Sequence, residues 1–265
     1  MDHEPRFWSL PEGEAGGEPL PSSDGKWIAY ISDAADDWDH LYIAAADGGE
    51  PIELTSGHSE AWRPAWSHDS QSLSFDTNES DHPGSRRIGI VTVGADASHP
   101  TLRYVTTLDG TNTEPLWSPQ DTQLVYQHTD WLNSADLYAV SSTGSTKPTR
   151  LTNSMPAELD KSLLVKPQYV TFPGADGTPV PGWLFLPKNL DQTKKHAAIV
   201  WIHGDGINQN LRRLAHSAKL RGLLQLPPVF AAAGICGLRS GLPREHRLRK
   251  QMALSRLYGC WRQGC

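Results

Sequence analysis

Short apolar stretches alternate with turn residues over the first part of the chain. In the best-defined copy, Trp27–Ile31 is rich in aromatic and β-branched residues, and a second apolar run covers Leu41–Ile43. Asp24-Gly25 precedes these runs and Asp47-Gly48-Gly49 follows them. Such residues tolerate the positive φ that a tight turn needs, so the pattern predicts antiparallel hairpins rather than helices.

The same pattern recurs twice more. Serines open the three copies at Ser22, Ser67 and Ser118, which lie 45 and 51 residues apart. Further strands are expected at Ile88–Val93, Leu102–Val105, Leu137–Val140 and Arg150–Thr152. A period of roughly 40 to 50 residues is typical of a four-stranded propeller blade. The alternative is a meander of unrelated hairpins, and the recurring landmarks favour the repeat.

Three pairs of landmarks carry a family resemblance. Trp66-Ser67 and Trp117-Ser118-Pro119 begin two copies, Leu41-Tyr42 and Leu137-Tyr138 mark the middle, and Leu54-Thr55 and Leu151-Thr152 mark the close. This order resembles the TolB-like propeller repeat. The resemblance implies three blades over residues 21–155, after an irregular lead-in at 1–20. Because rings close with roughly four to eight blades, we expect these to be the end of a longer propeller.

A different pattern follows in residues 156–210, after a linker. Gln168–Phe172 and Val180–Leu186 read as two strands around the turn Ala175-Asp176-Gly177. The run His196–Ile202 is continuous and largely apolar, as expected of a strand buried on both faces. It ends in the glycine-rich string His203-Gly204-Asp205-Gly206.

The hairpin and buried strand after propeller repeats resemble the prolyl oligopeptidase family of serine peptidases, in its dipeptidyl-peptidase and acylaminoacyl-peptidase-like branches. The resemblance implies a mainly β chain, with a partial propeller followed by the first strands of an α/β-hydrolase domain. It also implies that His203, Gly204 and Gly206 form the loop that helps to build the oxyanion hole, where backbone donors stabilise developing charge. Asp205 departs from the family pattern, in which a second glycine is usual.

The catalytic machinery of such a peptidase is missing. A nucleophile elbow reads G-x-S-x-G between a strand and a helix, and the string does not occur. The nearest string is Gly57–Ala61, with Ser59 at its centre, and it lies in a turn between two repeats. No metal or dinucleotide motif is found, so no cofactor is expected. We therefore expect a fragment that is itself inactive, whose complete relatives cleave peptides. The rival class is a non-enzymatic propeller that binds a protein or peptide.

Composition adds bounds on location. The chain is 38% hydrophobic and 20% charged, with 20 prolines, 23 glycines and 10 tryptophans, as suits a turn-rich β protein. No stretch approaches the roughly 20 apolar residues of a membrane span. The first residues lack the basic and apolar regions of a secretory signal, which favours a cytoplasmic location. The oligomeric state is left open.

Residues 211–265 break the pattern. They carry nine Arg and two Lys against the single Glu245, whereas the chain as a whole has a net charge of −6. A basic disordered tail, a helical element, a nucleic-acid arm and a shifted reading frame are the alternatives.

The genetic code favours the shifted frame. Codons for Gln225–Gly241, read one base later, permit Ser-Phe-His-Gln-Tyr-Leu-Gln-Gln-Arg-Gly-Tyr-Val-Val-Tyr-Ala-Val-Asp. Those for Leu242–Arg249 permit Tyr-Arg-Gly-Ser-Ile-Gly-Tyr. These strings resemble the family's next helix, strand and loop. We therefore expect a frameshifted, disordered tail that binds no nucleic acid, and no functional role for Cys236, Cys260 or Cys265.

Overall fold

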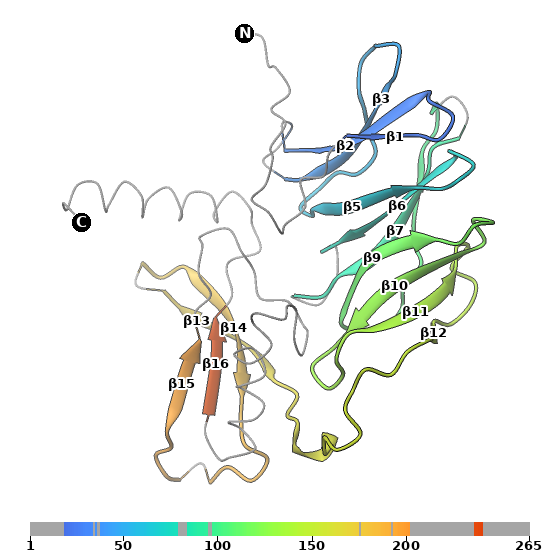
Figure 1. The fold of residues 1–265 in the computed structure, drawn as a ribbon. Coiled ribbons are helices and arrows are strands. Elements are labelled where there is room, and N and C mark those ends of the chain that lie inside the picture. The colour runs from blue at the N-terminus through green and yellow to red at the C-terminus, as the bar shows by residue number, and fades with distance from the viewer. Residues whose placement is uncertain are drawn as a thin grey trace, which may run out of the picture. The chain divides into compact units, whose positions relative to one another are not determined.

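A computed structural model describes residues 19–33, 35, 38–78, 84–94, 97–174, 176–191, 193–201 and 236–240. The chain forms two compact units (Figure 1). Unit 1 comprises residues 1–128 and 136–153, and unit 2 comprises residues 129–135 and 154–265. Within the described residues the secondary structure is strand, with one short 3-10 turn and no α-helix. The prediction of a mainly β fold is confirmed.

Unit 1 consists of three four-stranded sheets, which we call blades one, two and three. Blade one contains β1 (Leu20–Pro21), β2 (Trp27–Ser32), β3 (His40–Ala45) and β4 (Ile52–Glu53). Blade two contains β5 (Ala61–Trp66), β6 (Ser72–Thr77), β7 (Arg87–Thr92) and β8 (Thr101–Tyr104). Blade three contains β9 (Thr111–Trp117), β10 (Gln123–Thr129), β11 (Asp136–Ser141) and β12 (Thr149–Arg150). In each blade, every strand pairs with the next one along the chain.

The repeated serine has the same structural role in all three blades. Its hydroxyl oxygen accepts the backbone N–H of the residue five positions later, at the start of the second strand. The donor–acceptor distances are 3.0 Å from Trp27 to Ser22, 2.9 Å from Ser72 to Ser67 and 3.1 Å from Gln123 to Ser118. The serine therefore closes the first turn of every blade, which explains why it recurs.

Apolar cores fill the spaces between neighbouring blades. One core joins blades one and two through residues such as Leu41, Ile43 and Phe75, and a second joins blades two and three through residues such as Ile88 and Leu124. Strand β7 serves both, because alternate residues point to opposite faces. Ile88 and Ile90 belong to the second core, and Val91 and Val93 to the first.

Two polar contacts repeat at the blade junctions. The indole Nε1–H of Trp66 donates to the carbonyl of Leu20, and that of Trp117 donates to Ala65, both at 3.0 Å. Leu20 and Ala65 occupy the same position in their blades, two residues before the repeated serine. The contact therefore ties the first strand of blade two to that of blade one, and the first strand of blade three to that of blade two.

The first turns are also linked. Ser70 and Asp121 occupy the same left-handed position in blades two and three, with φ of 61° and 56°. Ser70 Oγ accepts the backbone N–H of Asp24 in blade one at 3.1 Å. Asp121 accepts the backbone N–H groups of His68 and Asp69 at 3.1 and 3.0 Å, and its Oδ1 lies 2.8 Å from His68 Nδ1.

Unit 2 contains a mixed sheet. Its strands are β13 (Gln168–Pro173), β14 (Pro179–Phe185), β15 (Ala198–Trp201) and β16 (Cys236–Ser240), preceded by the 3-10 turn η1 (Lys161–Leu163). Their order is β13-β14-β16-β15, with β16 antiparallel to β14 and parallel to β15. The expected hairpin is present as β13 and β14.

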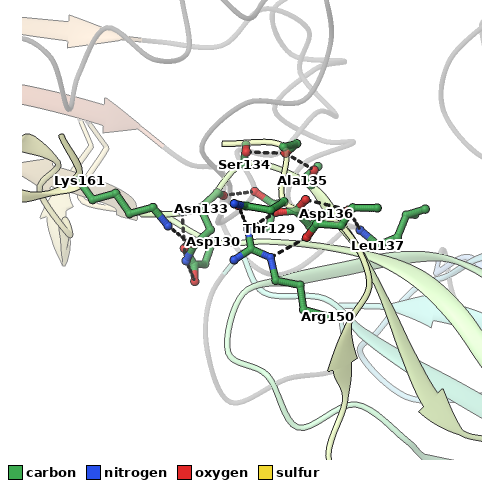
Figure 2. Close-up of polar contacts among 12 residues, drawn as sticks. Thr129, Asp130, Asn133, Ser134, Ala135, Asp136, Leu137, Arg150 and Lys161 are labelled. Atoms are coloured by element: carbon green, nitrogen blue, oxygen red, sulfur yellow. Dashed lines mark hydrogen bonds and ion pairs between the residues drawn. The ribbon is translucent and has the colours of Figure 1, made fainter. Parts of the chain in front are cut away.

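The loop at residues 129–135 belongs to unit 2, although it joins two strands of blade three. Trp131 packs against Trp183 and Phe185, with ring centroids 5.1 and 5.5 Å apart. Asp130 shapes the loop by accepting the backbone N–H groups of Leu132 and Asn133 at 2.7 and 2.8 Å (Figure 2). The sequence pattern did not reveal that this hairpin loop would supply core to the second unit.

The structure also differs from the sequence-based prediction at the first strand of each blade and in the tail. Strands β1, β5 and β9 precede the serines at which the repeats were taken to begin. In the segment 211–265, for which we expected disorder, Cys236–Ser240 form β16. The remainder of that segment, and residues 1–18, lie outside the described residues.

We predict that Gly89→Ala destabilises unit 1. A Cβ at Gly89 would lie 2.6 Å from Phe75 Cζ, a contact that a packed core relieves only by displacement. The expected loss in unfolding free energy, measured by urea denaturation, is about 1–3 kcal/mol. The double variant Gly89→Ala/Phe75→Leu should recover part of it, because the shorter side chain frees space. If the double variant lost as much stability as the two single variants together, this packing account would be contradicted.

A second prediction concerns pH. Burial acts to raise the pKa of Asp121, yet hydrogen bonds from His68 and Asp69 outweigh it and lower that pKa. The stabilisation should be fully present above the unfolded carboxyl pKa of about 3.9, and lost as the pH falls through the lower folded pKa. In urea unfolding from pH 6 to pH 3, Asp121→Asn should therefore flatten the acid loss of stability, whereas the exposed control Asp47→Asn should keep the wild-type slope. Equal slopes for all three proteins would refute the linkage.

Candidate functional site

Two non-glycine residues with an uncommon backbone conformation lie on the first strands of blades two and three. Arg63 on β5 and Glu114 on β9 each precede a proline and lie four residues before the repeated serine. Both have left-handed backbones, with φ of 50° and 58°. Non-glycine residues adopt this conformation at a cost of about 1 kcal/mol or more, so the surrounding structure must hold them in it.

A β-bulge explains how Arg63 is aimed. Trp62 pairs with Asp76 on β6, and Ala65 pairs with Ser74, so that Arg63 and Pro64 together face only Phe75. An extra residue of this kind bends the strand and redirects its side chain. Here the bulge directs the Arg63 guanidinium to the carboxylate of Asp76.

Asp76 is the centre of a buried charge cluster. Its side chain is completely buried, and both carboxylate oxygens lie 3.1 Å from Arg63 Nη1. Oδ1 also accepts from Arg86 Nη1 at 3.1 Å, and Oδ2 from the backbone N–H of Glu114 at 3.3 Å. Three donors from β5, β9 and the residue before β7 thus converge on one acid, which is how a buried carboxylate is made tolerable.

The cluster continues into neighbouring polar groups. The Arg86 guanidinium lies over the ring of Trp62, 3.7 Å from its centroid. The backbone carbonyl of Arg86 accepts from Asn112 Nδ2 at 2.8 Å, and Asn112 Oδ1 lies 2.9 Å from His128 Nδ1. The amide of Gln127 donates to the carboxylate of Glu114. The first strands are therefore held in place by polar bonds as well as by the apolar cores.

A second buried acid, Asp136 in blade three, is organised differently. It forms an ion pair with Arg150, and its Oδ1 accepts from Thr152 Oγ1 at 2.8 Å (Figure 2). Thr152 in turn accepts the backbone N–H of Leu137 at 2.9 Å. These bonds close the outer end of blade three, so the role of Asp136 is to stabilise the blade.

The structure gives Ser59 no catalytic setting. It lies in a pocket of about 430 Å³, lined also by Leu54, Thr55, Ser56, Glu60, Ala61, Phe75, Thr77, Leu102 and Tyr104. The next element is strand β5 rather than a helix, and the ring of His58 stacks on Trp38 with centroids 5.7 Å apart. In the described part of the chain, no histidine forms a hydrogen bond with Ser59. Within the described residues, Ser59 therefore lacks both the nucleophile elbow and the general base that a catalytic serine needs.

His203, Gly204 and Gly206, which are predicted to form the oxyanion loop, lie outside the described residues. Its expected support, β15, is present and ends at Trp201. The stretch of the sheet that precedes the loop is exposed, with 38% of Ile199 and 60% of Val200 accessible to solvent.

The described residues contain no group of three or more histidine, cysteine or acidic side chains arranged to hold a metal ion. Within the same residues, no helix has the length and apolar character that crossing a membrane requires.

Comparison with known proteins relates this fold to peptidases. No protein-family model matches the sequence. Over 56 residues the chain is 39% identical to the uncharacterized peptidase YuxL of Bacillus subtilis (strain 168), a match that covers 21% of this chain and 8% of YuxL.

Two solved structures are similar over most of the chain. Dipeptidyl peptidase 4 of Porphyromonas gingivalis superposes with a TM-score of 0.65 at 15% identity, over 83% of this chain and 30% of that one. A puromycin-hydrolyzing peptidase of Mycobacterium tuberculosis gives 0.66 at 18% identity, over 88% and 35%. At these identities the likeness is one of fold. The chain spans 30% and 35% of the length of these two peptidases.

Four residues of the charge cluster were not predicted from the sequence: Arg63, Asp76, Arg86 and Glu114. A signal was present in the repeat, because Arg63-Pro64-Ala65-Trp66-Ser67 and Glu114-Pro115-Leu116-Trp117-Ser118 share a charged residue followed by proline. Asp76 and Arg86 are recognised only from the structure, since nothing in their spacing marks them as partners.

We predict that Asp76→Asn strongly destabilises unit 1, because it removes the acid that compensates two guanidinium groups. Breaking a buried ion pair by removing one partner costs about 3 kcal/mol or more, and Arg63 is only 26% exposed. Urea denaturation should show a loss of about this size, against less than about 0.5 kcal/mol for the exposed control Asp47→Asn. Equal stability of the two variants would show that the cluster does not stabilise the fold.

Proposed function

We propose that this chain is part of a serine peptidase of the prolyl oligopeptidase family. In this proposal blades one to three are TolB-like propeller blades, and unit 2 is the beginning of the α/β-hydrolase domain. The mixed sheet β13-β14-β16-β15 is the observation that carries the proposal, because a propeller that only binds a partner has no need of it. The similarity in fold to two peptidases supports the same assignment.

The topology of the sheet suits a hydrolase domain. Parallel neighbours require a crossover connection of a dozen or more residues, and residues 202–235 separate β15 from β16. In open α/β sheets, ligands bind outside the carboxyl ends of the strands. His203, Gly204 and Gly206 directly follow the carboxyl end of β15. Their proposed role is to offer backbone N–H groups to the oxyanion formed when a peptide carbonyl is attacked.

The chain as given would not complete this reaction. Acyl transfer needs a serine, a base hydrogen-bonded to it and a group that orients the base. Ser59 has no such base in the described residues, and Asp205 would oppose negative charge beside the proposed oxyanion site. We therefore propose that peptide hydrolysis belongs to complete relatives, and that this chain is inactive.

The shifted reading frame is part of the same proposal. The one-base-shifted reading of Gln225–Gly241 places Val-Val-Tyr-Ala-Val at residues 236–240, which are the bounds of β16. Four of those five residues (three valines and a tyrosine) are strong strand formers, whereas the present Cys-Gly-Leu-Arg-Ser is a weak strand sequence. The coincidence supports a strand of the hydrolase sheet that is encoded at this place in the other frame.

An assay on two proteins tests the proposal. The chain as given should hydrolyse neither dipeptidyl nor acyl-aminoacyl chromogenic substrates. A version in which the other frame is restored after Asn210, with the downstream sequence included, should hydrolyse one of these classes and react with a serine-directed fluorophosphonate. Turnover by the chain as given that disappears in Ser59→Ala would overturn the assignment. Failure of the folded, restored protein to react would favour the non-enzymatic propeller instead.

A further inference from the structure

The outer edge of blade two carries backbone groups that no described strand pairs. β8 is the last strand in the order β5-β6-β7-β8, and among the described strands it pairs with β7 alone. In antiparallel strands, alternate residues direct both of their backbone groups to the same side. The N–H of Val105 donates to the carbonyl of Ile88 at 3.0 Å, so Val105 and Arg103 face β7. Leu102 and Tyr104 therefore direct their N–H and C=O groups to the free edge.

This edge is longer than the outer edges of the other two blades. β8 has four residues, whereas β4 and β12 have two each. Short edge strands and charged side chains on the edge ordinarily prevent pairing with another chain. The charged residue of β8, Arg103, is engaged on the opposite face of the sheet, where its guanidinium donates to the carbonyl of Ser142 and to Thr92 Oγ1. Leu102 is 42% exposed, so the strand is open to an added one.

A pocket lies beside the same edge. The pocket of about 430 Å³ that contains Ser59 is lined also by Leu102 and Tyr104, the two residues whose backbone groups face the free edge. Directly opposite residues of paired strands have their side chains on the same face of the sheet. A residue that paired with Leu102 would therefore direct its side chain toward this pocket. A free strand edge and a pocket for alternate side chains are the two components of peptide recognition by strand addition.

The residues around the pocket favour a neutral side chain that forms hydrogen bonds. Six of the ten lining residues carry a hydroxyl or a carboxylate: Thr55, Ser56, Ser59, Glu60, Thr77 and Tyr104. Glu60 is only 4% exposed. A second carboxylate brought close to it would be disfavoured, because like charges repel strongly where water is excluded.

We propose that the outer edge of β8 binds an extended peptide segment, which pairs with Leu102 and places a neutral polar side chain, such as that of glutamine, in the adjacent pocket. The turn of blade three at Gly144 bounds the site at its other end, because a Cβ there would lie 3.6 Å from the carbonyl oxygen of Tyr104. The paired segment is therefore short. This inference goes beyond the proposed function and does not depend on it, since binding at the edge of a blade requires no catalytic residue.

Titration of the full chain with a five-residue peptide tests this site. The probe is N-acetyl-Thr-Val-Gln-Val-Thr amide, and its binding is followed by ligand-observed NMR. N-methylation of the glutamine removes the N–H that would donate to the carbonyl of Leu102, whereas N-methylation of the valine after it leaves that bond in place. The first modified peptide should bind at least about tenfold more weakly than the second. A peptide with glutamate in place of glutamine should also bind more weakly than the probe, because of Glu60.

Two variants of Leu102 separate the backbone from the side chain. Leu102→Pro removes the N–H at the edge and spares the bonds to β7, since proline is tolerated on an edge strand where the missing N–H would face solvent. It should bind the probe at least about fivefold more weakly than the matched control Leu102→Ala, which keeps the N–H. Ser56→Trp fills the pocket from an exposed position, so it should abolish the preference for glutamine over glutamate.

Three outcomes would overturn the edge site: no binding of the probe by the wild type at a few millimolar, equal binding of the two N-methylated peptides, or equal binding by folded Leu102→Pro and Leu102→Ala. If circular dichroism shows Leu102→Pro to be unfolded, the two N-methylated peptides decide with the wild type. Equal affinity for the glutamine and glutamate peptides, or a preference that survives in Ser56→Trp, would refute the role of the pocket. Hydrolysis is not read in these measurements, so this site and the peptidase assignment stand or fail separately.

Discussion

The bond from an indole N–H to the carbonyl of the preceding blade is the constraint on which the rest of unit 1 depends. Each blade is a sheet with two faces, and β7 shows that the middle blade must bury both. Apolar packing alone specifies neither the spacing nor the rotation of neighbouring sheets, because it is not directional. The bonds from Trp66 to Leu20 and from Trp117 to Ala65 fix both at the same place in successive blades. Stacked repeats are stabilised through such interfaces between neighbours.

The charge cluster depends on this alignment. Asp76 is held by donors from its own blade and by the backbone of Glu114, which belongs to the next one. The acid can be fully buried only because the first strands of two blades are brought together at a fixed distance. The same alignment stabilises the left-handed backbone at Arg63. Without strands β6 and β9 held beside it, this backbone would be free to relax.

The sequence predicted the outer strands of each blade well, and for a clear reason. Strands such as β2, β3 and β11 alternate or concentrate apolar residues between recognisable turns, so their pattern is local. Strands β5 and β9 were missed because each contains a proline and a charged residue, which read as loop. Their strand conformation depends on bonds to other blades, such as those of Trp117 and Glu114. The partners of Asp76 are distant in sequence for the same reason, and no local pattern reveals them.

The second unit is discontinuous in the chain, and this has a consequence for its synthesis. Trp131 reaches the ribosome exit about fifty residues before Trp183 and Phe185, the aromatic side chains that bury it. Blade three must therefore form around a hairpin loop whose large indole has no partner yet. A chaperone that recognises exposed aromatic residues would find one there during this interval. Cutting the gene after Asn153 would yield a second unit that lacks part of its own core, so the two units cannot be separated by a single boundary in the chain.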